Sequence, residues 1–260
     1  MDAALPTLFI SHGGPTILVD RTSAHAFLAG LGGSLPRPRA ILSISAHWLE
    51  PGATVSGAAW PETIHDFYGF PREFYDIHYA APGAPDVARR VAELLTAAGV
   101  GAAIDPAHGL DHGTWVPALL SWPAADIPIL QLSLLESGDA AAHLAVGRAL
   151  RPLRDEGVLI IGSGSATHNL GALLYGRHDV VLDWARAFDD WLAARLSDGD
   201  VAALLDWKRA APSALKCHPT DEHFLPLFVA LGAASDGAKG RALHRSVMHA
   251  SLSMASYAFD

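Results

Sequence analysis

The segment AILSISAHW (residues 40–48) decides the fold class, because an apolar run of strand length opens here into a polar stretch that carries a histidine. Runs of the same character recur at TLFI (7–10), IPILQLSL (127–134) and GVLIIGSG (157–164), each bounded by Gly, Pro or Ser. Short runs rich in Ile, Leu and Val are typical of strands buried in a mainly parallel sheet.

Longer stretches with apolar residues at helical spacing lie between these runs, at residues 86–99, 140–157 and 182–200. The alternation predicts an α/β fold: one three-layer domain over residues 1–260, with a central mixed or mainly parallel sheet covered by helices on both faces. Residues 48–82 break the rhythm, being rich in aromatics, Pro and Gly. A long insertion of this kind is more often a binding loop than a linker.

Composition excludes several classes of protein. Apolar residues make up 50% of the chain and charged residues 17%, so a sizeable core is expected. The net charge of -9 argues against a nucleic-acid binder and against a polybasic membrane anchor. No apolar run is long enough to span a bilayer, and a single cysteine excludes an internal disulfide. We expect a cytoplasmic protein with a small ligand.

Two histidines stand where predicted strands end. His12 follows the first run, and His47 ends the second. Open α/β sheets bind ligands at the carboxyl ends of their strands, and neutral imidazole is the commonest protein ligand for zinc and iron. His12 alone could belong to an ordinary turn, and His47 could be a core histidine beside Trp48. Together they favour a shared metal.

His223 opens the apolar stretch HFLPLFVALGAA (223–234), directly after Glu222. Neighbours in a helix point about 100° apart, so at most one of the pair should bind a given ion. Two histidines and a carboxylate would make the facial triad of Fe(II) oxygenases, whereas three histidines also suit zinc. The residues alone leave this choice open.

Other histidines lie in polar or aromatic loops. His168, in GSGSATHN, is placed to act as an acid/base beside a metal-bound substrate. His112 and His65 could contact a planar substrate or orient a ligand, although each alone is as readily structural. Trp48 and Phe67 would add aromatic walls to hold a flat ring. His218 and Cys217 lie close to the His223 segment without an assigned role.

The order of these motifs resembles a known family. LFISHGGP (8–15), TIHDFYGFP (63–71), GLDHGTWVPALL (109–120), GSGSATHNL (162–170) and HPTDEHFLPLFVALGAA (218–234) are similar to class III extradiol ring-cleavage dioxygenases. The most similar branch is that of the bacterial relatives of the DOPA 4,5-dioxygenases. The resemblance runs over nearly the whole chain.

That resemblance implies a single α/β domain with one metal ion at the strand ends. It implies that His12, His47 and His223 are the metal ligands, that His168 is the acid/base, and that His112 lines the substrate site. Fe(II) is the metal expected for activity, and Zn(II) can occupy the same site. The expected reaction inserts both atoms of O₂ into a catechol ring and opens it.

Two other functions fit the same residues. A zinc-dependent hydrolase would use the three histidines to activate water and would consume no O₂. A metal-binding scaffold without turnover would lack an acid/base, and the presence of both His168 and His112 argues against it.

Overall fold

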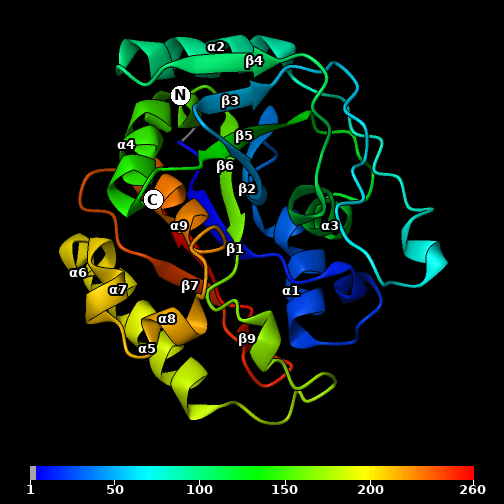
Figure 1. Cartoon of the computed structure of the whole chain (residues 1–260). Coiled ribbons are helices and arrows are strands. Elements are labelled where there is room, and N and C mark those ends of the chain that lie inside the picture. The colour runs from blue at the N-terminus through cyan, green and yellow to red at the C-terminus, as the bar shows by residue number, and fades with distance from the viewer. Residues whose placement is uncertain (1–3) are drawn as a thin grey trace.

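A mixed sheet of eight strands runs through the centre of residues 4–260, the part of the chain that the computed structural model describes (Figure 1). In sheet order the strands are β4 (Ala102–Asp105), β3 (Ala53–Ser56), β5 (Ile129–Leu135), β2 (Ala40–Glu50), β6 (Val158–Gly164), β1 (Thr7–Ser11), β10 (Ser256–Phe259) and β7 (Arg241–His244). A small second sheet pairs β8 (Val247–Met248) with β9 (Leu252–Ser253).

The four central strands β5, β2, β6 and β1 are parallel, as expected for the four apolar runs. Antiparallel pairs join β3 to β5, β10 to β1 and β7 to β10, so the sheet is mixed. Since the central strands are parallel, their carboxyl ends meet at one edge of the sheet. The predicted α/β fold with a mixed sheet is therefore confirmed.

Helices cover both faces of the sheet (Figure 1). They are α1 (Ser23–Leu31), α2 (Pro85–Ala97), α3 (His112–Ser121), α4 (Ala140–Leu150), α5 (Asp183–Asp198), α6 (Val201–Leu205), α7 (Trp207–Ala210), α8 (Ala214–Cys217) and α9 (Leu225–Ala233). Short 3₁₀ helices lie at Pro15–Leu18, Gly32–Ser34, Arg72–Phe74, Arg151–Arg154 and Leu170–Ala172.

Alternate strand residues serve two separate cores, because successive side chains point to opposite faces. Phe9, Leu42 and Ile160 pack under α2, α4, α5 and α9. Ile10 and Ile41 pack on the opposite face, under α1 and α3. Among the described residues, no helix is long and apolar enough to cross a membrane.

Several boundaries differ from the sequence expectation. Residues 48–50 continue β2, because the chain stays paired with β5 after a register shift, and residues 53–56 form β3. The insertion therefore runs only over residues 57–82. His112 begins a helix capped by Asp111 rather than lying in a loop. His223 lies in a turn, two residues before α9 begins.

Candidate active site

Three histidines from distant parts of the chain converge at the carboxyl edge of the parallel strands. His12 follows β1, His47 lies near the end of β2, and His223 precedes α9. Their candidate ligand atoms all lie within 4.8 Å of one another, and the Nε2 atoms of His12 and His47 are 3.1 Å apart. The structure thus brings together the three residues that the sequence nominates for a metal.

Each of the three rings has an oxygen atom facing its Nδ1. The His12 Nδ1–H donates to Ser163 Oγ at 3.0 Å, and the Ser163 hydroxyl donates onward to the Gly113 carbonyl. The His223 Nδ1–H donates to Glu222 Oε1 at 3.0 Å. For His47 the facing oxygen is Asp66 Oδ2, at 3.6 Å. The hydrogen bonds of His12 and His223 fix their tautomers and leave Nε2 free to bind an ion, whereas the contact of His47 with Asp66 is longer than a hydrogen bond.

The three rings are held in the neutral form that metal binding requires. Burial, reinforced by the neighbouring histidines, puts the pKa of His12 and His223 well below the usual value. Burial and the charge of His112 lower the pKa of His47 to about 3.

The donor set fits a metal ion. Two nitrogen ligands at about 2.0–2.1 Å from one ion are separated by roughly 3.0–3.4 Å, which matches the distance between His12 Nε2 and His47 Nε2. Neutral imidazoles held by outer oxygen atoms are ligands that suit both Fe(II) and Zn(II). Glu222 orients His223 through its Nδ1, so the carboxylate is engaged at the outer side of the ring.

His168 stacks on His223, with ring centroids 3.4 Å apart and planes 8° from parallel. Its segment is hydrogen-bonded to the segment that precedes His223. The His168 N–H donates to the Cys217 carbonyl at 2.9 Å, and the His218 Nε2–H donates to the Ala166 carbonyl at 3.0 Å. These bonds give His218 and Cys217 a structural part in placing His168. Burial lowers the pKa of His168 to about 4, so its ring is neutral near pH 7.

The Cys217 side chain is inert by its surroundings. Burial raises the pKa of the thiol to about 12, which leaves almost no reactive thiolate at neutral pH.

His112 joins the same cluster from the first turn of α3. Its ring centroid lies 4.0 Å from that of His47 and 5.6 Å from that of His12. Asp66 accepts hydrogen bonds from both the backbone N–H and the ring Nδ1–H of His112, each at 2.9 Å. A polar network thus extends from the insertion into the cluster.

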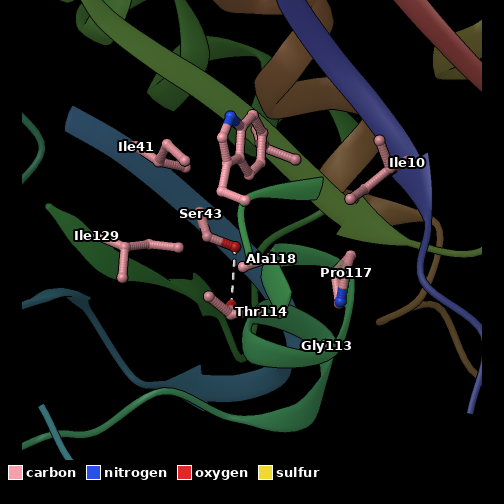
Figure 2. A pocket seen from close by; sticks show the side chains of 10 residues that line it. Ile10, Ile41, Ser43, Gly113, Thr114, Pro117, Ala118 and Ile129 are labelled. Atoms are coloured by element: carbon pink, nitrogen blue, oxygen red, sulfur yellow. Dashed lines mark hydrogen bonds between the residues drawn. The ribbon is translucent and has the colours of Figure 1, made fainter. Parts of the chain in front are cut away.

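Close approach of α3 to the ligands depends on Gly113. A Cβ at this position would lie 2.9 Å from the His47 ring and 3.1 Å from the His12 ring. Behind Gly113 an apolar pocket lies between the sheet and α3, lined by Ile10, Ile41 and Ile129 (Figure 2). Its polar groups are paired, since Ser43 and Thr114 share a hydrogen bond of 2.8 Å (Figure 2). A largely apolar pocket therefore adjoins Gly113.

The remaining nominated residues lie farther out. Phe67 packs edge-on against His112, with ring centroids 5.7 Å apart. His65 donates from Nε2 to the Ile77 carbonyl at 2.9 Å, within the insertion. Trp48 stacks on His108, with centroids 3.5 Å apart, and donates to Glu50. Phe67 thus reaches the cluster, whereas His65 and Trp48 have partners outside it.

The sequence reading missed three residues that support the site: Asp66, Asp111 and Ser163. Asp111 caps α3 through Thr114 N–H and accepts from Ser45 Oγ at 2.7 Å. Burial raises the pKa of Asp111 to about 6. An acidic residue just before the helical stretch from residue 112 is a capping signal, and it could have located this helix. Asp66 and Ser163 lie beside nominated residues, but nothing in the sequence pairs them with His112 or His12.

Comparison with known proteins identifies relatives over nearly the whole chain. Residues 7–260 match the family described as the catalytic LigB subunit of aromatic ring-opening dioxygenase. A 4,5-DOPA dioxygenase extradiol of Beta vulgaris is 42% identical over 97% of this chain and 96% of its own. A protein of the same name from Escherichia coli K12 is 40% identical over 88% of this chain and 85% of its own.

A solved structure agrees with these sequence matches. The crystal structure of an uncharacterized protein of Escherichia coli K12 superposes with a TM-score of 0.82 at 34% identity. The match covers 98% of this chain and all of that one.

Proposed function

We propose a catechol as the substrate of this chain, which belongs to the family of LigB catalytic subunits of aromatic ring-opening dioxygenases and is an extradiol ring-cleaving dioxygenase. The observation that carries the proposal is the convergence of His12, His47 and His223, each with an oxygen atom facing its Nδ1. We further propose that residues 1–260 form one catalytic domain.

We propose these three histidines as the metal ligands, Fe(II) as the active ion and Zn(II) as an ion that the same nitrogens can hold. Fe(II) at this position would give the catechol oxygens and O₂ a common binding point and would lower the pKa of the bound hydroxyl. Glu222 then serves to orient His223 and does not itself bind the ion.

His168 is the proposed acid/base. Burial lowers its pKa to about 4, so the ring is neutral near pH 7 and can accept the proton of a catechol hydroxyl whose own pKa a bound metal ion would lower. The stacking on His223 keeps the ring beside the ligand cluster. The same nitrogen can return the proton when the ring opens.

His112 and Phe67 are the proposed substrate contacts. His112 faces the ligands from α3, and Phe67 packs against it from the insertion, where it would cover one side of a flat ring and exclude water. His65 is hydrogen-bonded to Ile77, and Trp48 is hydrogen-bonded to Glu50. Both would support the walls of the substrate site rather than contact the substrate.

The names of the relatives suggest which catechol to test first. Three plant relatives and one bacterial relative at 40–42% identity are called 4,5-DOPA dioxygenase extradiol. The carboxylates of Asp66 and Glu222 are already engaged by His112 and His223, so the choice of DOPA rests on the names of these relatives. DOPA or a catechol amine is the proposed substrate class.

Oxygen uptake tests this proposal. Metal-free protein is loaded anaerobically with Fe(II) or with Zn(II) and mixed with DOPA, dopamine, protocatechuate or unsubstituted catechol. We expect the iron-loaded protein to consume O₂ in step with loss of DOPA or dopamine, and the zinc-loaded protein to consume none, since zinc has no redox chemistry. Absence of uptake with every catechol, or faster uptake with protocatechuate, would contradict the proposed substrate class.

A further inference from the structure

We propose that Asp66 is a positioning residue for ring cleavage, holding His112 so that the bare Nε2 of its ring is available to the substrate. The proposal rests on the assignment of His12, His47 and His223 as ligands and of His112 as a substrate contact.

The contacts of Asp66 fix both the place and the tautomer of the His112 ring. Oδ1 accepts the backbone N–H of His112 at 2.9 Å, and Oδ2 accepts the ring Nδ1–H at 2.9 Å. An ionised carboxylate can only accept, so whenever the His112 ring carries a single proton that proton lies on Nδ1. Nε2 then has a free lone pair that can accept a hydrogen bond from a catechol hydroxyl.

Asp66 is itself held firmly, although it lies in a long insertion. On one side Ile64 N–H donates to the Leu110 carbonyl at 2.8 Å, and Trp115 Nε1–H donates to the Ile64 carbonyl at 2.9 Å. His65, which directly precedes Asp66, is hydrogen-bonded through Nε2 to the Ile77 carbonyl. Hydrogen bonds therefore join the segment that carries Asp66 to the segment before α3 and to α3 itself.

A role limited to capping α3 does not account for these contacts. Asp111 already caps the helix, since its Oδ1 accepts Thr114 N–H at 3.1 Å. The second oxygen of Asp66 goes to the ring of His112 and lies 3.6 Å from the Nδ1 of His47. Asp66 thus faces two rings of the cluster, a placement that helix capping does not require.

The substitution Asp66→Asn changes the tautomer of His112 while it keeps the size and shape of the side chain at position 66. The amide presents one donor and one acceptor in place of two acceptors. If the amide oxygen keeps the backbone N–H of His112, its NH₂ group meets Nδ1 and moves the ring proton to Nε2. We expect ¹⁵N NMR of the zinc-loaded protein to show Nδ1 of His112 protonated in the native chain and Nε2 protonated in the variant.

Kinetics of the iron-loaded protein give the second readout. We expect Asp66→Asn to lower kcat by about 10²-fold, the lower end of the range for a group that exchanges a proton with the substrate, with metal content unchanged. The KM for DOPA should change by less than about threefold, because the ring keeps its place. Asp66→Glu should recover part of kcat, since it restores an acceptor to Nδ1.

The matched control is Asp76→Asn, which makes the same change at an exposed position of the same insertion. The proposal would be overturned if NMR showed no proton on Nδ1 of His112 in the native chain. It would also be overturned if the kcat of Asp66→Asn lay within twofold of that of Asp76→Asn. Loss of metal from Asp66→Asn would also overturn it, because Asp66 would then act through His47. If the variant does not fold, the NMR spectrum of the native chain still decides. That spectrum needs no turnover, so failure of the proposed substrate is distinguishable from failure of this inference.

Discussion

His168 stacks on His223 and has a ring nitrogen close to Glu222 and His223, but it does not belong to the group formed by His12, His47 and His223, so its role can be tested apart from theirs. We expect His168→Phe to keep the stacking on His223 and the metal content, while lowering kcat with DOPA by about 10²–10⁴-fold. Metal analysis and steady-state kinetics on the same sample give both numbers. If the variant loses its metal as His12→Ala does, His168 is a ligand and the proposed acid/base is wrong.

Glu222 and His223 are adjacent in the chain, and the question for them is which of the two side chains binds the metal ion. The Glu222 carboxylate accepts from His223 Nδ1 at 3.0 Å and from Thr220 Oγ1 at 2.9 Å. We expect Glu222→Gln to lower zinc affinity by less than about tenfold, because an amide oxygen can still accept from the ring. Glu222→Ala should cost about 10–100-fold, the usual effect of removing an outer partner.

Isothermal titration with Zn(II) measures these affinities, with His223→Ala as the reference for loss of a ligand. A Glu222→Gln variant as weak as His223→Ala would show that the carboxylate binds the ion.

At the scale of elements, the packing of β6 against residues 223–226 sets the position of the third proposed ligand. A Cβ at Gly164 would lie 2.1 Å from the His223 carbonyl oxygen, and one at Gly162 would lie 2.2 Å from that of Pro226. Gly162 and Gly164 therefore allow close packing of backbone on backbone.

Gly164→Ala tests this packing. The added methyl must push the His223 backbone away, so we expect zinc affinity to fall by more than tenfold even though no ligand is removed. Gly30→Ala is the control: its Cβ meets nothing within 4 Å, and alanine in a helix should be neutral or stabilising by about 1 kcal/mol. Equal zinc affinities for the two variants would refute the packing argument.

Elements with strong apolar patterns were predictable from the sequence, and weakly patterned ones were not. The four buried runs became β1, β2, β5 and β6 because each lies in a core on both faces. The short strands β3 and β4 are not among the elements that the sequence predicts. β4 is a half-exposed edge strand, and β3 is joined to β2 by a turn that reads as loop. The helix α3 was obscured by Gly113 and Pro117 in its first two turns.

Some residues of the candidate site were likewise predictable from the sequence, and others were not. His12 and His47 were nominated because the ends of parallel strands must meet, a rule that needs only the strand pattern. The link between Asp66 and His112 spans 46 residues and depends on the path of the insertion. No local pattern encodes that path, so the sequence could not predict the network.

For the whole molecule, the cluster of buried histidine rings lowers the free energy of unfolding at low pH. Burial is the first cause of the lowered pKa at each of five histidines, and their charges repel one another. These are His12, His47, His168, His218 and His223. The pKa falls to about 3 for His47 and His218 and to about 4 for His168. The raised pKa of Asp111 has the opposite effect, since it increases the free energy of unfolding as the pH falls, but this is one group against five.

The sign of the effect follows from proton counting. Between about pH 6.5 and 4 the unfolded chain binds protons on these histidines and the folded chain does not, so the free energy of unfolding falls as the pH is lowered. His47, His168 and His218, whose pKa falls to about 3 or 4, each withdraw about 3–5 kcal/mol when fully titrated in the unfolded chain, against a total stability of about 5–15 kcal/mol for an ordinary protein. We therefore expect the metal-free chain to unfold at low pH.

We expect urea unfolding of the metal-free protein, followed by circular dichroism from pH 8 to 4, to show full stability above pH 6.5 and a steep loss below it. His168→Phe removes one of the titrating rings, so its acid midpoint should lie at lower pH than that of the native chain. Zinc should raise the unfolding midpoint at pH 7, because it binds the neutral imidazoles of the folded state, and should lose this effect toward pH 5. A stability that stays level between pH 7 and 5 would mean that the rings accept protons within the fold, and the neutral three-histidine cluster on which the proposed metal site depends would have to be abandoned.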